Sequence, residues 1–172
     1  PINGLFNYEI LSANDRTDFI NGKSIEDQMG ALAITNESGV TYHYTLPVYT
    51  YDEYVESFLS SANNANQGDS WNRQYNDEPY AYTWLLTGIT GPDFIDRGEL
   101  GTLDEEDWGY WVSFDYGKWT DSYQWRTPGE GKNSDLLEKV EHFSYGKKQI
   151  YYLDAIKTRT HTALFVKEIR KD

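Results

Sequence analysis

Acidic side chains gather between Asp96 and Asp107 at a spacing that suggests metal chemistry. Asp96, Gly101, Asp104 and Asp107 take the first, sixth, ninth and twelfth positions of a loop of the EF-hand type. Carboxylate oxygens surround calcium in such a loop, and glycine at the sixth position allows its sharp turn. Calcium is therefore the candidate ion for this chain.

The same loop lacks oxygen ligands where calcium needs them. Its third and fifth positions are Gly98 and Leu100, and Asp107 replaces the longer glutamate that binds calcium through two oxygens. Because oxygen ligand number sets affinity, we expect a degenerate loop with solvated charges rather than a tight site. The candidate metal ligands are Asp96, Asp104 and Asp107, and no other cofactor is predicted.

Aromatic side chains cluster in the segment that follows this loop. Trp111, Trp119, Tyr123 and Trp125 are the candidate ligand-binding residues, because aromatic faces stack on the apolar faces of sugar rings. The alternative is that they pack in the interior, as Trp and Tyr commonly do in β-sheets, and this interpretation is favoured. An exposed, coplanar pair would reverse the preference.

Catalysis finds little support in the residue pattern. Glycoside hydrolysis needs two carboxylates, but with 28 acidic residues almost any fold brings two together, and no spacing singles out a pair. His43, His142 and His161 are too dispersed for a metal-binding pair. There is no nucleophile elbow, phosphate loop or dinucleotide fingerprint. We predict no catalytic residue, and a hydrolase is only the third hypothesis.

Composition narrows the classes of partner. The 172 residues include 15 Lys and Arg against 28 Asp and Glu, a net charge of −13 that repels nucleic acid and anionic lipid. The length suits a single domain over 1–172. Cysteine is absent, so disulfides and thiolate sites are excluded. The chain has no apolar run of membrane-spanning length and no signal-peptide features after Pro1, so we expect an excised or processed segment.

Alternating apolar and polar residues predict the secondary structure. The fold class is all-β, with mainly antiparallel hairpins in an RHS-like or sandwich-like arrangement and at most one or two short helices. Two short strands are predicted in the first forty residues, the second around 31–34. The further strands are predicted at 40–48, 80–86, 109–116, 148–157 and 161–169, the last two as a hairpin.

Helices and loops are predicted at three further places. Asp135 to Phe143 carries Leu and Val at helical spacing, and a second short helix is considered over Asp52 to Leu59. Residues 57–78 are rich in Ser, Asn, Gln and Asp and predict a long polar loop. Pro47 lacks an N–H and favours a sheet edge or strand end.

Several segments share the order of Tyr, Leu and Ile. Tyr82-Thr-Trp-Leu-Leu-Thr-Gly-Ile-Thr-Gly-Pro-Asp93 and Ile150-Tyr-Tyr-Leu-Asp-Ala-Ile156 resemble the strand-and-turn unit of RHS/YD-repeat proteins. Gly39-Val-Thr-Tyr-His-Tyr44 is similar to their Gly-x-x-Tyr-x-Tyr strands. The likeness covers scattered blocks of residues 39–172. The repeats are irregularly spaced and the family's turn is only partly present at 91–93, which puts a closed shell in doubt.

This resemblance sets the functional expectation. In RHS proteins, toxin-complex B/C shells and teneurins, such units stack as hairpins into a large spiralling sheet. Segments 107–119 and 151–160 also look like parts of very large bacterial surface proteins. The resemblance implies a non-enzymatic structural module of a secreted or cell-surface protein, whose partners are neighbouring domains of its parent chain. The alternative is a β-domain that uses aromatics 108–125 to bind a polysaccharide or a surface protein.

Overall fold

The described part of the chain forms one antiparallel sheet. The computed structural model describes residues 29–59, 70–128, 133–134 and 140–169. These ranges contain no helix, and so none long and apolar enough to cross a membrane. The all-β prediction is confirmed. The eight strands are β1 (Leu32–Thr35), β2 (Thr41–Leu59), β3 (Ser70–Asn76), β4 (Tyr80–Thr90), β5 (Trp111–Arg126), β6 (Asn133–Ser134), β7 (Val140–Thr158) and β8 (Thr162–Leu164).

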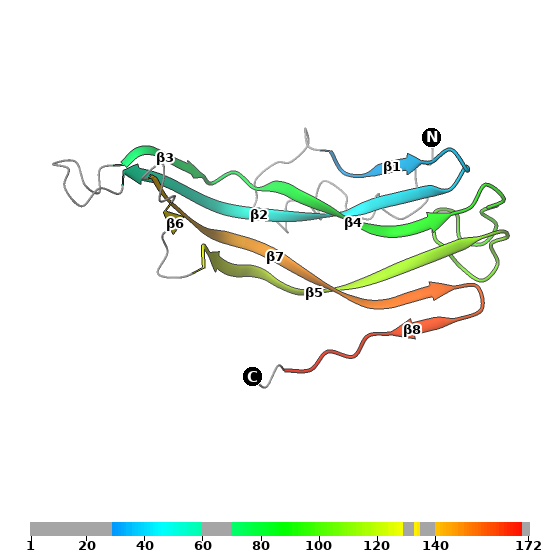
Figure 1. Cartoon of the computed structure of the whole chain (residues 1–172). Coiled ribbons are helices and arrows are strands. Elements are labelled where there is room, and N and C mark those ends of the chain that lie inside the picture. The colour runs from blue at the N-terminus through cyan, green and yellow to red at the C-terminus, as the bar shows by residue number, and fades with distance from the viewer. Residues whose placement is uncertain (1–28, 60–69, 129–132, 135–139, 170–172) are drawn as a thin grey trace.

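Two long ribbons, β2 with β4 and β5 with β7, make up most of the sheet. At one end they join through β4 and β5, where residues 88–90 pair with 111–113. At the other end they join through β2 and β7, where residues 50–59 pair with 140–148. Each ribbon therefore turns over once, and Figure 1 shows β2 crossing β4 and β5 crossing β7. Strong twist of this kind is typical of two-stranded ribbons.

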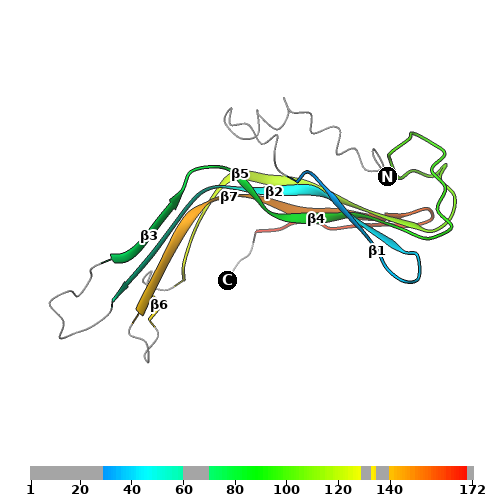
Figure 2. The same ribbon diagram turned by 90° about the horizontal axis from the view of Figure 1, so that it is seen from above.

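The sheet is a single layer that bends along its length, as Figure 2 shows. Register shifts between Thr50 and Asp52 and between Thr120 and Tyr123 lie in the same region, and such bulges bend a strand. No second sheet or helix among the described residues covers either face. Few side chains are consequently buried, and the buried apolar ones are Val48, Tyr49, Trp111 and Ala155.

A buried glutamine joins the two ribbons near their crossing. Gln149 of β7 is 1% exposed, and its Oε1 accepts a hydrogen bond of 3.1 Å from the backbone N–H of Tyr49 in β2. The backbone carbonyl oxygen of Gln149 accepts a hydrogen bond of 3.3 Å from the hydroxyl of Tyr82 in β4. Tyr51 packs against Tyr49 beside this contact. At the centre of the sheet, three tyrosine residues therefore surround Gln149.

Pro47 lies in a gap along one edge of β2. On this edge β1 pairs with β2 as far as Tyr44, and β7 begins to pair at Thr50. On the opposite edge Pro47 faces Trp84 of β4. Neither β1 nor β7 pairs with β2 at Pro47, so on this side no described strand needs the N–H that proline lacks. This agrees with the expected position at a sheet edge.

Two helix predictions are wrong where the structure tests them. Residues 52–59 belong to β2 and pair with β3 on one side and β7 on the other, so strand pairing overrides the local helical pattern. Residues 135–139 of the second predicted helix lie outside the described residues, and 140–143 begin β7. Residues 140–143, whose apolar spacing predicted a helix, are therefore in a strand.

The polar loop predicted over 57–78 is also shorter than expected. Residues 57–59 end β2, and Ser70–Asn76 form β3; residues 60–69 lie outside the described part. The sequence of β3 shows no apolar alternation because, in a single layer, both faces of this strand meet solvent. The C-terminal hairpin is confirmed, although β8 covers only 162–164 of the predicted second strand. The earlier of the two N-terminal strands falls outside the described residues, whereas β1 matches the second.

A second buried polar contact lies toward the β4–β5 end of the sheet. His43 is 2% exposed, and its Nε2 lies 3.0 Å from the Oγ1 of Thr90 on the paired strand. Burial lowers the pKa of His43 from 6.5 to about 4, because desolvation disfavours the imidazolium. The native sheet therefore holds this histidine neutral well into the acidic range.

We expect His43→Gln to weaken the acid sensitivity of the fold. Between pH 6.5 and about 4 the unfolded chain binds a proton at His43 that the native chain does not. The free energy of unfolding must therefore fall as the pH drops through this window, by up to about 3 kcal/mol from this group. Urea unfolding at pH 7.5, 5.5 and 4.5 measures the loss, with exposed His161→Gln as the control. Parallel pH profiles for native protein and His43→Gln would contradict the assignment.

Candidate functional site

The acidic loop between β4 and β5 is organised by its own carboxylates. Asp107 is fully buried; its Oδ1 accepts a bond of 2.9 Å from the N–H of Arg97, and its Oδ2 accepts one of 3.0 Å from that of Asp104. Asp104 in turn accepts N–H bonds from Glu99 and Glu106 at 3.0 and 2.7 Å. The carboxylates thus satisfy backbone donors that the turns leave free.

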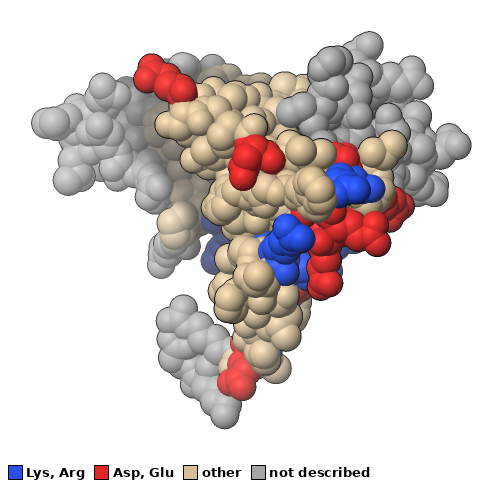
Figure 3. Space-filling view, turned by 90° about the vertical axis from the view of Figure 1, so that its right-hand side faces the viewer, with Lys and Arg blue, Asp and Glu red and all other residues tan. Residues whose placement is uncertain are grey.

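The three candidate metal ligands do not converge on a shared point. Asp96 accepts a bond of 3.0 Å from the N–H of Gly101. No group of three or more His, Asp or Glu side chains within the described ranges could hold a metal ion. Figure 3 shows this end of the molecule, where acidic side chains lie beside Lys and Arg. The described geometry favours a structural role for Asp96, Asp104 and Asp107.

The predicted aromatic residues of β5 occupy different environments. Trp111 is buried, Trp119 is 63% exposed and meets Tyr152 edge-on at 5.6 Å, and Tyr123 is about half exposed. Trp125 is half-buried and lines a pocket farther along the sheet. The interior interpretation therefore describes Trp111, whereas the other three reach the surface. The four do not form one flat platform.

That pocket is built on a row of side chains that register places across four strands. Tyr75 of β3 faces Tyr54 of β2, which faces Tyr145 of β7, which faces Arg126 of β5. Directly paired residues share one face of a sheet. Three tyrosines and an arginine, distant in sequence, thereby become neighbours; we call Tyr75, Tyr54 and Tyr145 the tyrosine row.

The neighbouring rows on the same face supply most of the remaining lining, because residues two positions apart along a strand point the same way. On one side of the tyrosine row, Asp52, Lys147 and Gln124 pair across β2, β7 and β5. On the other side, Phe143 faces Glu56. The result is an aromatic centre with a polar rim.

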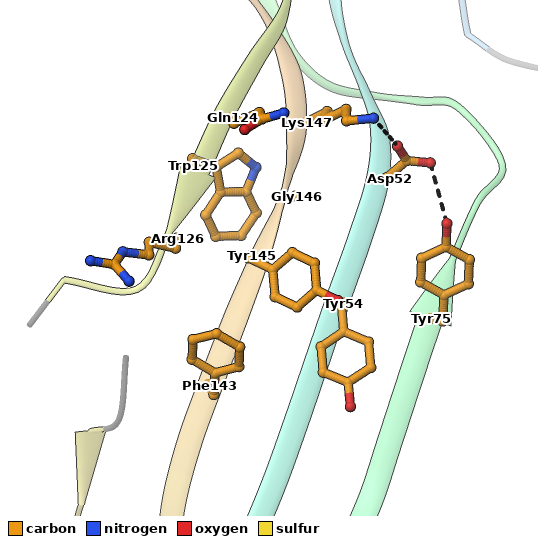
Figure 4. A pocket seen from close by; sticks show the side chains of 10 residues that line it. All are labelled: Asp52, Tyr54, Tyr75, Gln124, Trp125, Arg126, Phe143, Tyr145, Gly146 and Lys147. Atoms are coloured by element: carbon orange, nitrogen blue, oxygen red, sulfur yellow. Dashed lines mark hydrogen bonds and ion pairs between the residues drawn. The ribbon is translucent and has the colours of Figure 1, made fainter. Parts of the chain in front are cut away.

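The pocket measures about 660 Å³ and lies on the bent part of the sheet. The ring centroids of Tyr54 and Tyr145 are 5.0 Å apart with planes 30° apart, and Phe143 lies 5.5 Å from Tyr145. Figure 4 shows the three rings next to one another, and the plane of Phe143 is tilted by 48° from that of Tyr145. Gly146 borders the pocket beside Trp125, and a side chain there would collide with the carbonyl oxygen of Asp52.

Charged groups hold the phenols of the row in place. Asp52 accepts a bond of 3.5 Å from the hydroxyl of Tyr75 and pairs with Lys147 at 3.5 Å, and Glu56 accepts one of 3.0 Å from Tyr54. The charge of Asp52 is the main cause that raises the pKa of Tyr75. The pKa of Tyr54 is raised chiefly by desolvation, and secondly by its hydrogen bond to Glu56. Both phenols stay neutral and able to hydrogen-bond in neutral solution.

Sequence reasoning found one residue of this pocket, Trp125, and missed the tyrosine row. Tyr54 fell in the predicted short helix and Tyr75 in the predicted polar loop. No periodic signal could have found the row, because residues 52–56, Asp-Glu-Tyr-Val-Glu, place acidic side chains at both parities of a strand.

Comparison with known proteins places no constraint on this site. No protein-family model, no curated protein and no solved structure matches the chain. The functional argument therefore depends on the geometry of these residues alone.

We expect calcium to leave the thermal stability of the chain unchanged. The carboxylates of the 96–107 loop already accept backbone N–H bonds, and no group of three or more of the described His, Asp or Glu side chains could hold an ion. Melting temperatures in millimolar calcium and in chelator measure the effect, with magnesium as the ionic control. A rise of several degrees specific to calcium would contradict this view, and its loss in Asp104→Asn would place the ion in the loop.

Proposed function

We propose that the chain is a non-enzymatic structural module of a larger secreted or cell-surface protein with RHS/YD-like repeats. The observation that carries the proposal is the open edge beside β7. Leu164, Val166 and Ile169, in β8 and the residues after it, are 75%, 88% and 88% exposed. Neighbouring segments of the parent chain are the proposed partners of this edge.

An apolar edge of this kind is costly for a domain that stands alone. Edge strands present unpaired backbone groups, and soluble proteins usually protect them with charge, bulges or covering segments. Here β8 pairs with β7 over three residues, and the N–H of Phe165 still donates to the carbonyl of Asp154 at 2.9 Å. The chain therefore stays beside β7 as far as Phe165, and the outer edge of this segment has no pairing partner among the described residues.

The described contacts also argue for a non-enzymatic role. Ser57 and His142 form a hydrogen bond of 2.9 Å, which is a pairing that hydrolases use. However, these residues face each other in the β2–β7 ladder, and Ser57 is buried, so its hydroxyl is closed to a substrate. No described hydrogen bond joins a carboxylate to His142. The contact is that of an ordinary cross-strand pair.

We expect the isolated chain to self-associate through this edge, because a second copy can replace the missing neighbour. Sedimentation velocity from micromolar to hundreds of micromolar should show larger species, and Val166→Lys, which adds a charge to the edge, should shift them toward monomer. Leu100→Lys is the control, since Leu100 is 80% exposed but lies in the acidic loop. A native chain that stays monomeric and excludes apolar dyes would contradict the proposal.

A further inference from the structure

The tyrosine pocket has features that a structural module does not require. Tyr75 is 62% exposed and Tyr145 45% exposed, so a large part of each aromatic side chain meets solvent. Exposed aromatic side chains that lie together over a pocket commonly mark a binding surface. The role of this pocket is independent of the scaffold role proposed above.

We infer that the tyrosine pocket binds an acidic saccharide, namely an oligosaccharide that contains hexuronate units. The rings of Tyr54, Tyr145 and Phe143 form its floor, and Arg126 pairs with the sugar carboxylate. Asp52, Gln124 and Lys147 face the sugar hydroxyls from the rim. The assignment differs from the aromatic set predicted from the sequence, which shares only Trp125 with it.

The floor suits a sugar ring because of how its side chains lie. The rings of Tyr54 and Tyr145 are stacked, with centroids 5.0 Å apart and planes 30° apart, and Figure 4 shows them displaced sideways from one another. The displaced part of each ring face is therefore open to a ligand. A pyranose presents a row of axial C–H groups to such a surface, and large ring contacts of this kind contribute most of the apolar area of a site.

The charge of the pocket is opposite to that of the chain. The charged residues that line it are Arg126 and Lys147 against Asp52, two positive and one negative, in a chain of net charge −13. Lys147 is paired with Asp52 at 3.5 Å. Arg126 is exposed at the end of the tyrosine row, and no ion pair joins it to another described residue. Its planar fork of donors matches a carboxylate.

The rim supplies both donors and acceptors, as a pattern of hydroxyl groups requires. The amide of Gln124 offers both, Asp52 offers lone pairs, and the ammonium of Lys147 offers donors. All three belong to one row across β2, β7 and β5, so they line one side of the aromatic floor.

Calorimetric titration with trigalacturonate, and with galactotriose as the uncharged counterpart, tests the inference. We expect trigalacturonate to bind, and to bind more weakly as salt is raised. Tyr145→Ala and Arg126→Gln should each reduce its affinity by about tenfold or more. Tyr145→Phe should retain most of the binding, and Arg126→Lys should recover only part of it, because it keeps the charge but not the fork.

Tyr152→Ala is the matched control. Tyr152 lies on the same strand, is equally exposed and contacts Trp119, away from the pocket. Binding that survives Tyr145→Ala but is lost in Tyr152→Ala would overturn the inference, as would equal affinity for galactotriose, affinity for a polyproline peptide alone, or no binding of trigalacturonate. Arg126→Gln alters an exposed side chain, so it tests the site even if Tyr145→Ala fails to fold. Self-association of the chain is measured separately and does not enter this result.

Discussion

The exchange of inner strands between the two ribbons is the constraint on which the rest of the structure depends. β4 and β5 are joined at one end and β2 and β7 at the other, so each ribbon has to turn over between them. At the turnover neither ladder can satisfy every backbone group, and Gln149 accepts the N–H of Tyr49 across the gap. A buried amide that lacks a partner costs free energy, so this bond stabilises the sheet where the ribbons cross.

The position of the crossing in turn determines which residues meet at the far end. Once β2 and β7 are the inner strands, Tyr54 is opposite Tyr145, and the outer strands add Tyr75 and Arg126 to the same row. A shift of one residue in this register would send the tyrosines to the opposite face. The pocket is therefore a consequence of long-range register, and Gly146 preserves that register by allowing the backbones to approach at the bulge.

Strand positions could be predicted from the sequence because alternation is a local property. β4, the beginning of β2 and the hairpin of β7 with β8 follow directly from it. The ends of the long strands could not, because residues 52–57 and β3 carry no regular alternation of apolar and polar residues to reveal them. Their strand character comes from pairing with segments far away in the chain, and local propensity carries no record of such pairing.

The two candidate sites differ in the same way, because one is formed by neighbours in the sequence and the other by long-range strand pairing. The acidic loop is local, and its sequence alone places Asp96 and Asp104 near the backbone N–H groups of Gly101 and Glu99 to which the structure shows them bonded. The tyrosine row is not local, since Tyr54, Tyr75 and Tyr145 have no common motif and acquire their relation only through pairing. For Trp111 the aromatic cluster left both a binding surface and the favoured interior position open, and its place in the sheet buries it. In a single-layer sheet, then, composition indicates that aromatic surface will be available, and register alone decides which aromatic residues can act together on a ligand.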